Sequence, residues 1–260
     1  MNILFIGDIV GRPGRVAIQK LLKSVQTEYN IDFSIVNGEN AAGGNGITRE
    51  VAEEIYQAGA NCITTGNHVW DQRQVFEFIN QDNKLVRPSN YPAGAPGRGF
   101  TVLKSPKGIM VGVANFSGRV FMTPLDDPFQ EANKVVSHLN TLAKIIFVDF
   151  HAEATSEKIA MGWFLDGRVS AVCGTHTHVQ TADERVLPGG TAYITDVGMT
   201  GPRDSVLGVK KETVITKFLT QLPTRFEVAG GPVQLNAVVV DVDEWTGKAR
   251  SIVRVQKFIG

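Results

Sequence analysis

Short apolar runs alternate with amphipathic segments over the first half of the chain, and this alternation restricts the fold more than any other feature. The apolar runs, each of strand length, are residues 2–7, 33–36 and 61–65. The segments between them, residues 13–29 and 48–58, carry apolar side chains at the three- and four-residue spacing of a helix that buries one face. Strands that alternate with helices in this way pair in parallel, so we expect a parallel sheet.

The second half of the chain adds two buried strands and then changes pattern. Residues 144–150 and 169–173 are β-branched and apolar runs separated by a predicted helix. Residues 234–241 and 249–255 are joined by a short polar turn, which predicts an antiparallel hairpin. A parallel first half and an antiparallel end indicate an α/β fold with two packed β-sheets flanked by helices. No linker or repeat interrupts the chain, and we expect a single domain over residues 1–260.

Several helix ends can be predicted from the residues that flank them. Thr48, Asp71 and Thr155 each stand before a helical pattern and can cap it, because their side-chain oxygens accept hydrogen bonds from the first backbone N–H groups. Gly59 is expected to end the helix that Thr48 begins. His138 falls within a later predicted helix, where we expect it to be exposed and without a functional role.

Glycine and proline concentrate in three segments that cannot form regular structure. These are residues 87–99, 117–128 and 197–208, and we expect them to build the groove for a substrate. A glycine-rich turn at residues 43–46 allows two interpretations. Its backbone N–H groups could hold a phosphate ahead of the next helix, or it could be a tight turn only.

The charge balance limits the classes of partner, and the cysteines indicate the compartment. Lysine plus arginine equals aspartate plus glutamate, 26 of each, so no net field favours long nucleic acid or a membrane surface. No uncharged apolar segment approaches the roughly 20 residues that span a bilayer, and the amino-terminal run is too short for a signal peptide. Cys62 and Cys173 lie in apolar runs, which is typical of core residues in a reducing compartment. We expect a cytoplasmic protein; the sequence leaves open whether it forms a homo-oligomer.

Polar side chains follow most of the predicted strands at the point where each strand ends. The carboxyl ends of parallel strands meet at one edge of a sheet, so these side chains should converge. They are Asp8, Glu39, Asn40, Asn67, His68, His151, His176 and His178. Oxygen and nitrogen donors without a thiolate favour iron, manganese or zinc. Six or more donors suffice for two divalent ions, whose charge would exceed that of two carboxylates and would draw an anion such as phosphate.

The set contains one His-x-His pair, His176 and His178. Alternation along an extended segment would place both imidazoles on the same side, as in a site with two metal ligands. A His-x-His pair also occurs by chance in a solvated loop. The metal hypothesis therefore depends on the carboxylates and amides at the other strand ends.

Taken together, these residues resemble the calcineurin-like metallophosphoesterases, whose fold is a four-layer αββα sandwich. The resemblance rests on Gly-Asp after the first strand, an acidic residue after the second, Gly-Asn-His after the third, a strand-end histidine and His-Thr-His. Two positions depart from the common pattern: Val10 replaces a histidine, and Glu39 replaces the bridging aspartate. With the motifs GDIVGRPG, NGENAAGG and TGNHVWD, these departures resemble the YmdB-like branch of bacterial phosphodiesterases along the whole chain.

The resemblance implies two metal ions per chain, with iron as the expected metal and manganese able to substitute. The first ion would be held by Asp8, Glu39, Asn40 and His178. The second would be held by Glu39, Asn67, His151 and His176. His68 would be the general acid, and a metal-bound hydroxide would attack phosphorus. The implied enzyme is a metal-dependent phosphodiesterase that hydrolyses cyclic nucleotides, 2′,3′-cyclic monophosphates foremost and 3′,5′-cAMP as a further candidate.

Other functions remain open at this point. The chain could be a phosphatase or a phosphodiesterase acting on another small phosphoester, or a regulatory or RNA-associated module that retains the metals. Single residues also have simpler roles: Asp8 could cap a helix, Asn67 could support a turn, and His68 could be an exposed loop residue. The intact donor set favours an enzyme, because a pure binding module has no need for two desolvated cation sites.

Overall fold

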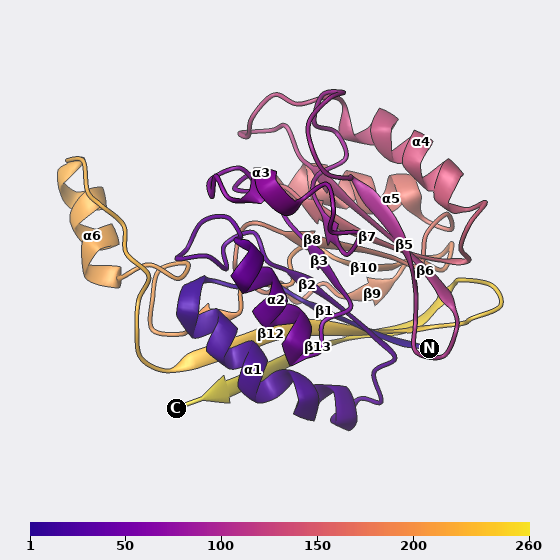
Figure 1. Ribbon diagram of the computed structural model, residues 1–260, viewed down its shortest axis with the longest axis horizontal. Coiled ribbons are helices and arrows are strands. Elements are labelled where there is room, and N and C mark those ends of the chain that lie inside the picture. The colour runs from indigo at the N-terminus through magenta and orange to yellow at the C-terminus, as the bar shows by residue number, and fades with distance from the viewer.

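The computed structural model describes residues 1–260 and contains two β-sheets stacked face to face (Figure 1). The first sheet consists of β1 (Asn2–Ile6), β2 (Phe33–Asn37), β3 (Cys62–Thr64), β4 (Leu85–Val86), β11 (Gly201–Pro202), β12 (Val233–Val242) and β13 (Ala249–Ile259). The second consists of β5 (Phe100–Lys104), β6 (Met110–Ser117), β7 (Ile145–His151), β8 (Ala171–Thr175), β9 (Arg185–Val186) and β10 (Ala192–Ile194). Two stacked sheets are the arrangement that the sequence predicted.

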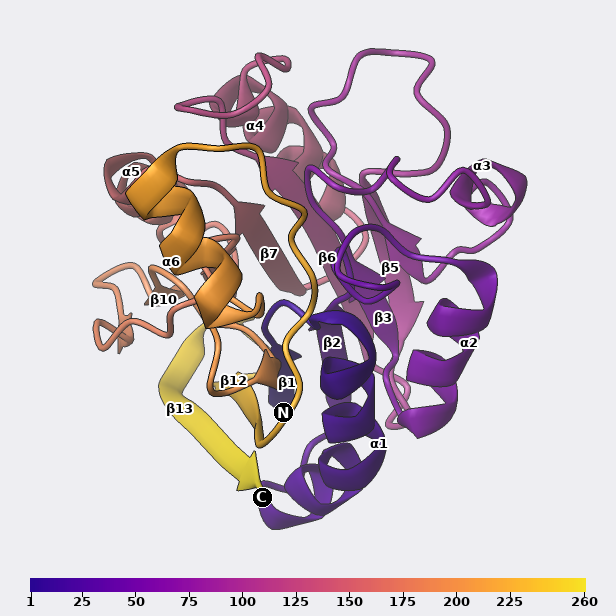
Figure 2. The same cartoon turned by 90° about the vertical axis from the view of Figure 1, so that its left-hand side faces the viewer.

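Helices cover the outer face of each sheet. The first sheet is covered by α1 (Gly11–Glu28), α2 (Arg49–Ala58) and α3 (Val75–Phe78), and the second by α4 (Pro128–Leu139) and α5 (Thr155–Leu165) (Figures 1 and 2). A sixth helix, α6 (Lys211–Thr220), projects away from both sheets. The four-layer αββα sandwich is therefore confirmed. None of the helices combines the length and the apolar composition that a bilayer crossing demands.

The two faces of β1 show how one short strand serves two layers of the core. Ile3 and Phe5 point between the sheets, where Phe5 meets Phe147 of β7 with ring centroids 5.0 Å apart. Leu4 and Ile6 point the other way, into the cluster beneath α1 and α2. Because strand side chains alternate between faces, an all-apolar strand is expected only where both faces are buried.

Parallel pairing places the carboxyl ends of the central strands at the same edge. β1, β2, β3 and β4 run parallel in the first sheet, and β6, β7, β8 and β10 run parallel in the second. The predicted hairpin is present as β12 and β13, and β12 pairs antiparallel with β1, so the end of the chain completes the first sheet. The sequence did not predict β4, β5, β9 and β11, three of which are only two residues long.

Both predicted ends of α2 are confirmed, and two other predicted N-caps are wrong. The Thr48 side chain accepts a hydrogen bond from the backbone N–H of Val51, and Gly59 ends α2 as expected. Asp71 does not cap α3, which begins after Gln74. Thr155 is the first residue of α5 and makes no capping hydrogen bond. Asp71 contacts His68 instead of its own helix, and Thr155 lies inside the helix that it was expected to precede.

His138 and the two cysteines have the exposure that the sequence predicted. His138 is exposed on α4, and its ring meets the edge of Phe100. Cys62 and Cys173 are unpaired and buried. The irregular segments 87–99 and 117–128 brace one another: the Asn90 amide donates to the backbone oxygens of Ser117 and Asp126, each at 2.9 Å.

Candidate metal centre

The seven residues expected to hold metal come together where the parallel strands end. They are Asp8 after β1, Glu39 and Asn40 after β2, Asn67 after β3, His151 at the end of β7, and His176 and His178 after β8. Asp8, Glu39, Asn40 and His151 are buried, and the other three are partly buried. Segments far apart in the chain thus meet at one point because the strands that carry them share an orientation.

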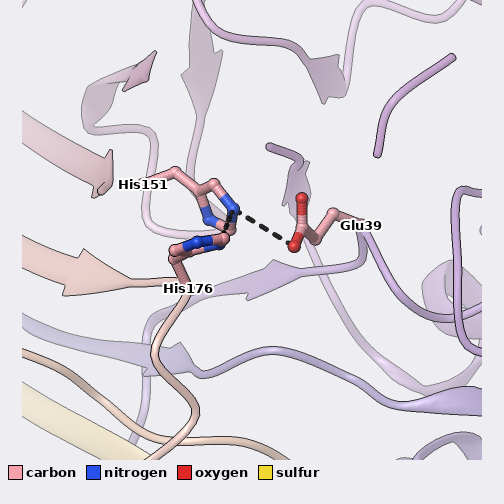
Figure 3. A group of neighbouring side chains, drawn as sticks. All are labelled: Glu39, His151 and His176. Atoms are coloured by element: carbon pink, nitrogen blue, oxygen red, sulfur yellow. Dashed lines mark hydrogen bonds and ion pairs between the residues drawn. The ribbon is translucent and has the colours of Figure 1, made fainter. Parts of the chain in front are cut away.

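One group of donors consists of Glu39, His151 and His176, whose ligand atoms all lie within 4.8 Å of one another. Nε2 of His151 lies 3.1 Å from Oε1 of Glu39 and 3.1 Å from Nδ1 of His176 (Figure 3). The same Nε2 atom lies 2.9 Å from Oδ1 of Asn67. Three potential metal ligands, from Glu39, His176 and Asn67, therefore surround one imidazole nitrogen. This is the arrangement expected where a cation would replace a shared proton.

A second group consists of Asp8, Glu39 and His178, again with ligand atoms within 4.8 Å. Asn40 adjoins it, with its Nδ2 atom 2.9 Å from Oε1 of Glu39 and 3.2 Å from Nε2 of His178. A half-turn about its terminal bond would present the amide oxygen instead, which is the atom that can bind a cation. Glu39 belongs to both groups, so its carboxylate is positioned to join them.

The backbone at the two histidines differs from the extended segment that the sequence suggested. His176 has φ 96° and His178 has φ 65°, so both lie in the region that non-glycine residues rarely adopt. This turn directs the two imidazoles into different donor groups of one centre, and both line the same cleft. The expectation of an extended segment was therefore wrong, because it assumed strand geometry beyond the end of β8.

A buried ion pair between Lys158 and Asp196 supports this turn. The Thr177 N–H and hydroxyl both donate to Oδ2 of Asp196, at 3.1 and 2.7 Å. Nζ of Lys158 also lies 2.7 Å from that oxygen, and its side chain is only 1% exposed. Strained backbone persists only where its surroundings fix it, and this network supplies such support between the two histidines. Neither Lys158 nor Asp196 was foreseen, since the contacts join residues on different elements.

Burial and mutual charge set the protonation of the centre. Burial raises the pKa of Asp8, against the opposing effect of the nearby histidines. Burial also disfavours a charged Glu39, but the positive charge and hydrogen bond of His151 outweigh it and lower the pKa of Glu39 to about 2. His151 is desolvated too, yet Glu39 raises its pKa to about 9. Burial, with the charge of His151, lowers the pKa of His176 to about 3. The pair Glu39 and His151 is thus ionised, while His176 is neutral.

A relay of hydrogen bonds keeps a proton on Nδ1 of His151 and orients the ring. Nδ1 of His151 lies 2.9 Å from the hydroxyl of Thr175, and that hydroxyl donates to Oδ1 of Asp149 at 2.7 Å. The Thr175 hydroxyl gives its own proton to Asp149, so it accepts from Nδ1–H and leaves Nε2 to face Glu39. Asp149 is buried, which raises its pKa to about 6. Such partners behind a histidine orient it and raise its basicity.

Two observations indicate that the centre fits a cation. Oδ1 of Asp8 is buried and has no hydrogen-bond partner, which is rare for a carboxylate oxygen in a folded protein. Gly66 lies directly against the site, and a Cβ atom there would collide with Oε2 of Glu39 and with the His151 ring. The oxygen and nitrogen donors suit a first-row divalent metal. The donor set, the unpaired oxygen and the space kept by Gly66 mark a metal-binding site.

His68 lies beside the donors without joining either group. Its backbone N–H donates to Oε2 of Glu39 at 3.3 Å, and its Nδ1 atom lies 2.8 Å from Oδ2 of Asp71. Asp71, expected to cap a helix, therefore orients His68 instead. The three-residue spacing in His-Val-Trp-Asp is the one signal in the sequence that could have indicated this pair.

A cleft of about 520 Å³ opens over the centre. Its wall includes Glu39, Asn40, His68, His176 and His178, together with Gly43, Gly44, Asn45, Leu207, Phe226 and Val228. Of the three irregular segments expected to build the groove, only residues 197–208 reach it, through Leu207. Residues 87–99 and 117–128 do not line this cleft, because they pack against one another. Residues 226–228, which the sequence did not suggest, take their place.

Comparison with known proteins agrees with this arrangement. The family model described as YmdB-like protein matches residues 4–255. The chain is 53% identical to the 2′,3′-cyclic-nucleotide 2′-phosphodiesterase of Bacillus subtilis (strain 168), over 98% of this chain and 96% of the relative. It also matches the crystal structure of a hypothetical protein from Thermus thermophilus, with 41% identity, a TM-score of 0.93 and 99% of each chain covered.

A second solved structure has the same TM-score. It is the crystal structure of a novel phosphatase from Mycoplasma pneumoniae, with 36% identity and a TM-score of 0.93, covering 99% of this chain and 93% of that one. The family match covers nearly the whole chain, and the Bacillus relative shares over half of the aligned residues. The chain belongs to the YmdB-like protein family.

Proposed function

We propose that this protein is a metal-dependent phosphodiesterase that hydrolyses small cyclic phosphodiesters, with 2′,3′-cyclic nucleotides as the first substrates. The observation that carries the proposal is the pair of donor groups that share Glu39 at the floor of the cleft. The name of the Bacillus subtilis relative supports the substrate class. The neutral net charge and a cleft of about 520 Å³ suit a nucleotide-sized ligand better than a long nucleic acid.

The seven residues of the metal centre would divide between two ions. Asp8, Glu39, Asn40 and His178 would hold one, and Glu39, Asn67, His151 and His176 would hold the other. Iron is the metal we expect, with manganese able to substitute, since both accept mixed oxygen and nitrogen donors. Two such ions supply Lewis acidity, which lowers the pKa of water and neutralises charge on a phosphoryl group.

His68 is the residue we assign to proton transfer. It lines the cleft, and its contact with Asp71 occupies Nδ1, so Nε2 is the nitrogen free to donate a proton. When a ribose oxygen leaves phosphorus it gathers negative charge, and a protonated imidazole beside it completes the leaving group. Asp71 is a positioning residue in this scheme, since it would fix the ring without touching the substrate.

The remaining walls of the cleft would bind the rest of the nucleotide. Gly43, Gly44 and Asn45 form one wall, and both glycines have positive φ values that turn the backbone sharply. Phe226 and Val228 add apolar side chains to the lining, and Val228 lies next to Gly44. An aromatic face beside a polar turn suits a base next to a phosphate. The buried, unpaired cysteines suit a reducing compartment, and we place this activity in the cytoplasm.

One preparation can test this function. Metal content should be measured first, and the same protein should then be assayed on 2′,3′-cyclic AMP, 3′,5′-cyclic AMP, a ribonucleoside monophosphate and a long RNA. We expect bound transition metal and fastest turnover of the 2′,3′-cyclic substrate. Faster cleavage of the monophosphate would make the protein a phosphatase, and faster cleavage of the RNA would overturn the preference for small esters.

A further inference from the structure

Lys158 of α5 carries a charge that solvent does not reach. Its side chain is 1% exposed, and that of its partner Asp196 is fully buried. A buried ion pair is weak evidence for stability, because the cost of desolvating two charges can exceed their attraction, and apolar residues of similar volume often serve as well. Stability alone therefore does not account for an ion pair at this position.

Asp196 connects the Lys158 ammonium to two stretches of backbone. Nζ of Lys158, the N–H of Thr177 and the hydroxyl of Thr177 all donate to Oδ2 of Asp196, at 2.7, 3.1 and 2.7 Å. Nζ also lies 3.3 Å from the Thr177 hydroxyl. Oδ1 of Asp196 accepts from the backbone N–H of Gly198 at 2.7 Å. One carboxylate thus fixes both the residue between the two ligating histidines and the segment 197–200.

The segment 197–200 in turn holds two of the proposed ligands by their backbones. The N–H of Met199 donates to the carbonyl of His178 at 3.1 Å, and the N–H of Thr200 donates to the carbonyl of Asp8 at 2.8 Å. Asp8 follows β1 of the first sheet, whereas His178 follows β8 of the second. The segment therefore fixes a ligand from one sheet relative to a ligand from the other.

The turn that carries the two histidines depends on contacts of this kind. His176 and His178 have positive φ values, and such a conformation persists only where the surrounding structure determines it. One of these histidines belongs to each donor group. A turn that relaxed toward an ordinary conformation would therefore displace a ligand of both groups at once.

We infer that Lys158 is a positioning residue for the metal centre, which acts through Asp196 to hold the ligands of the two donor groups at a fixed separation. This inference rests on the proposed two-metal function. Lys158 is too deeply buried to contact a substrate in the cleft, so its effect must pass through other residues. An ion pair suits this task better than apolar packing, because hydrogen bonds fix direction as well as distance.

Metal affinity and the magnetic coupling between two bound manganese ions test this role. Methionine at position 158 keeps the length of the side chain and removes its charge and donors. In Lys158→Met we expect the affinity for both ions to fall by about 10- to 100-fold. We also expect the coupling at full occupancy, measured by electron paramagnetic resonance, to change, because it depends on the separation of the ions. A variant that is less stable toward denaturant, but has wild-type affinity and coupling, would overturn the inference.

A second variant tests the same contacts if Lys158→Met leaves Asp196 unpaired and does not fold. Thr177→Val removes the hydroxyl that meets both members of the ion pair, and it should also lower the affinity and change the coupling. Thr177→Ser keeps a hydroxyl and should restore both wild-type values. Wild-type values in Thr177→Val, or no restoration by serine, would contradict the positioning role.

Thr191→Val is the matched control for the loss of a buried hydroxyl. The Thr191 hydroxyl donates to the carbonyl of Val169 at 2.7 Å and accepts from the N–H of Gly167 at 2.9 Å. Thr191 precedes β10 and so lies at the edge of the sheet opposite the metal centre. This variant should keep the wild-type affinity and coupling. An equal effect in Thr191→Val and Thr177→Val would show that any lost hydrogen bond disturbs the centre, and would overturn the inference.

The wild-type protein separates this inference from the proposed function. If wild-type protein binds fewer than two ions per chain, the two-metal function is wrong, and the positioning role is wrong with it. If wild-type protein binds two coupled ions and hydrolyses 2′,3′-cyclic AMP, while Lys158→Met and Thr177→Val match it, the function stands and only the positioning role is wrong.

Discussion

Oε1 of Glu39 lies 3.1 Å from Nε2 of His151, and neither side chain is more than 1% exposed. An acid and a base buried this closely form an ion pair, and each stabilises the charge of the other. Because Glu39 also belongs to the group with Asp8 and His178, it is the one carboxylate common to both donor groups. The roles we assign to the centre depend on this residue first.

Glu39→Gln should therefore weaken both proposed ion sites at once. The change keeps the size of the side chain and removes the charge, so we expect more than the 10- to 100-fold loss of affinity that follows from mutating an outer partner. Elemental analysis after equilibrium dialysis measures it. Glu153→Gln is the matched control: Glu153 touches only the far nitrogen of His176, at 3.1 Å, and should affect one ion at most. Two tightly bound ions in Glu39→Gln would show that the carboxylate does not bridge.

His68→Ala should retain both metals and lose turnover in a way that depends on the leaving group. On a ribose ester we expect kcat to fall by about 10² to 10⁴, the usual contribution of general acid catalysis. On a nitrophenyl ester, whose leaving group needs no proton, the loss should be much smaller. His138→Ala, an exposed histidine on α4, is the control and should change neither rate. Equal losses on the two esters would assign His68 to substrate binding or charge stabilisation.

Thr175→Val tests the hydrogen-bond relay behind His151. Valine keeps the shape of the side chain but removes the hydroxyl between Nδ1 of His151 and Asp149. We expect metal affinity to fall by about 10- to 100-fold, as for other partners that orient a ligating histidine. Competition with a chelator measures the affinity, and Thr141→Val, at an exposed position in the turn after α4, serves as the control. Unchanged affinity in Thr175→Val would mean that the relay does not orient the ring.

Metal binding should become tighter as pH rises through the neutral range. The pKa of His151 is raised to about 9, so the metal-free protein holds a proton on this imidazole at pH 7. A cation must displace that proton, which lowers its affinity below pH 9, while Glu39 stays ionised because its pKa is about 2. Calorimetry at pH 7 in two buffers of different ionisation enthalpy should detect the released proton. Binding without proton release would contradict an ionised His151.

The framework of the fold could be predicted because its signals are local. An apolar run followed by a polar residue marks a strand end. Parallel pairing brings Asp8 and Glu39 to one edge of the first sheet, and the stacked second sheet places His151 beside them. The single-domain organisation over residues 1–260 stays a prediction. The two-residue strands β4 and β9 could not be predicted, since so short a segment shows no periodicity.

The residues that support the metal centre could not be predicted from the sequence, for a different reason. Thr175 reaches His151 from the neighbouring strand, and Lys158 reaches Thr177 from a helix, so no spacing along the chain indicates these contacts. Asp149 is two residues before His151 on β7, but its link to the imidazole passes through Thr175. The division of His176 and His178 between two groups depends on positive φ values. A sequence pattern predicts which residues meet at the edge of a sheet, but their orientation comes from tertiary packing.

Titration of metal-free protein with manganese, followed by hydrolysis of 2′,3′-cyclic AMP, tests the dinuclear phosphodiesterase most directly. Protein stripped with a chelator should be inactive, and turnover should rise with added metal and level off at two equivalents per chain. A plateau at one equivalent would contradict the shared role of Glu39. Full turnover by the stripped protein, or none at any metal content, would contradict the proposed enzyme itself.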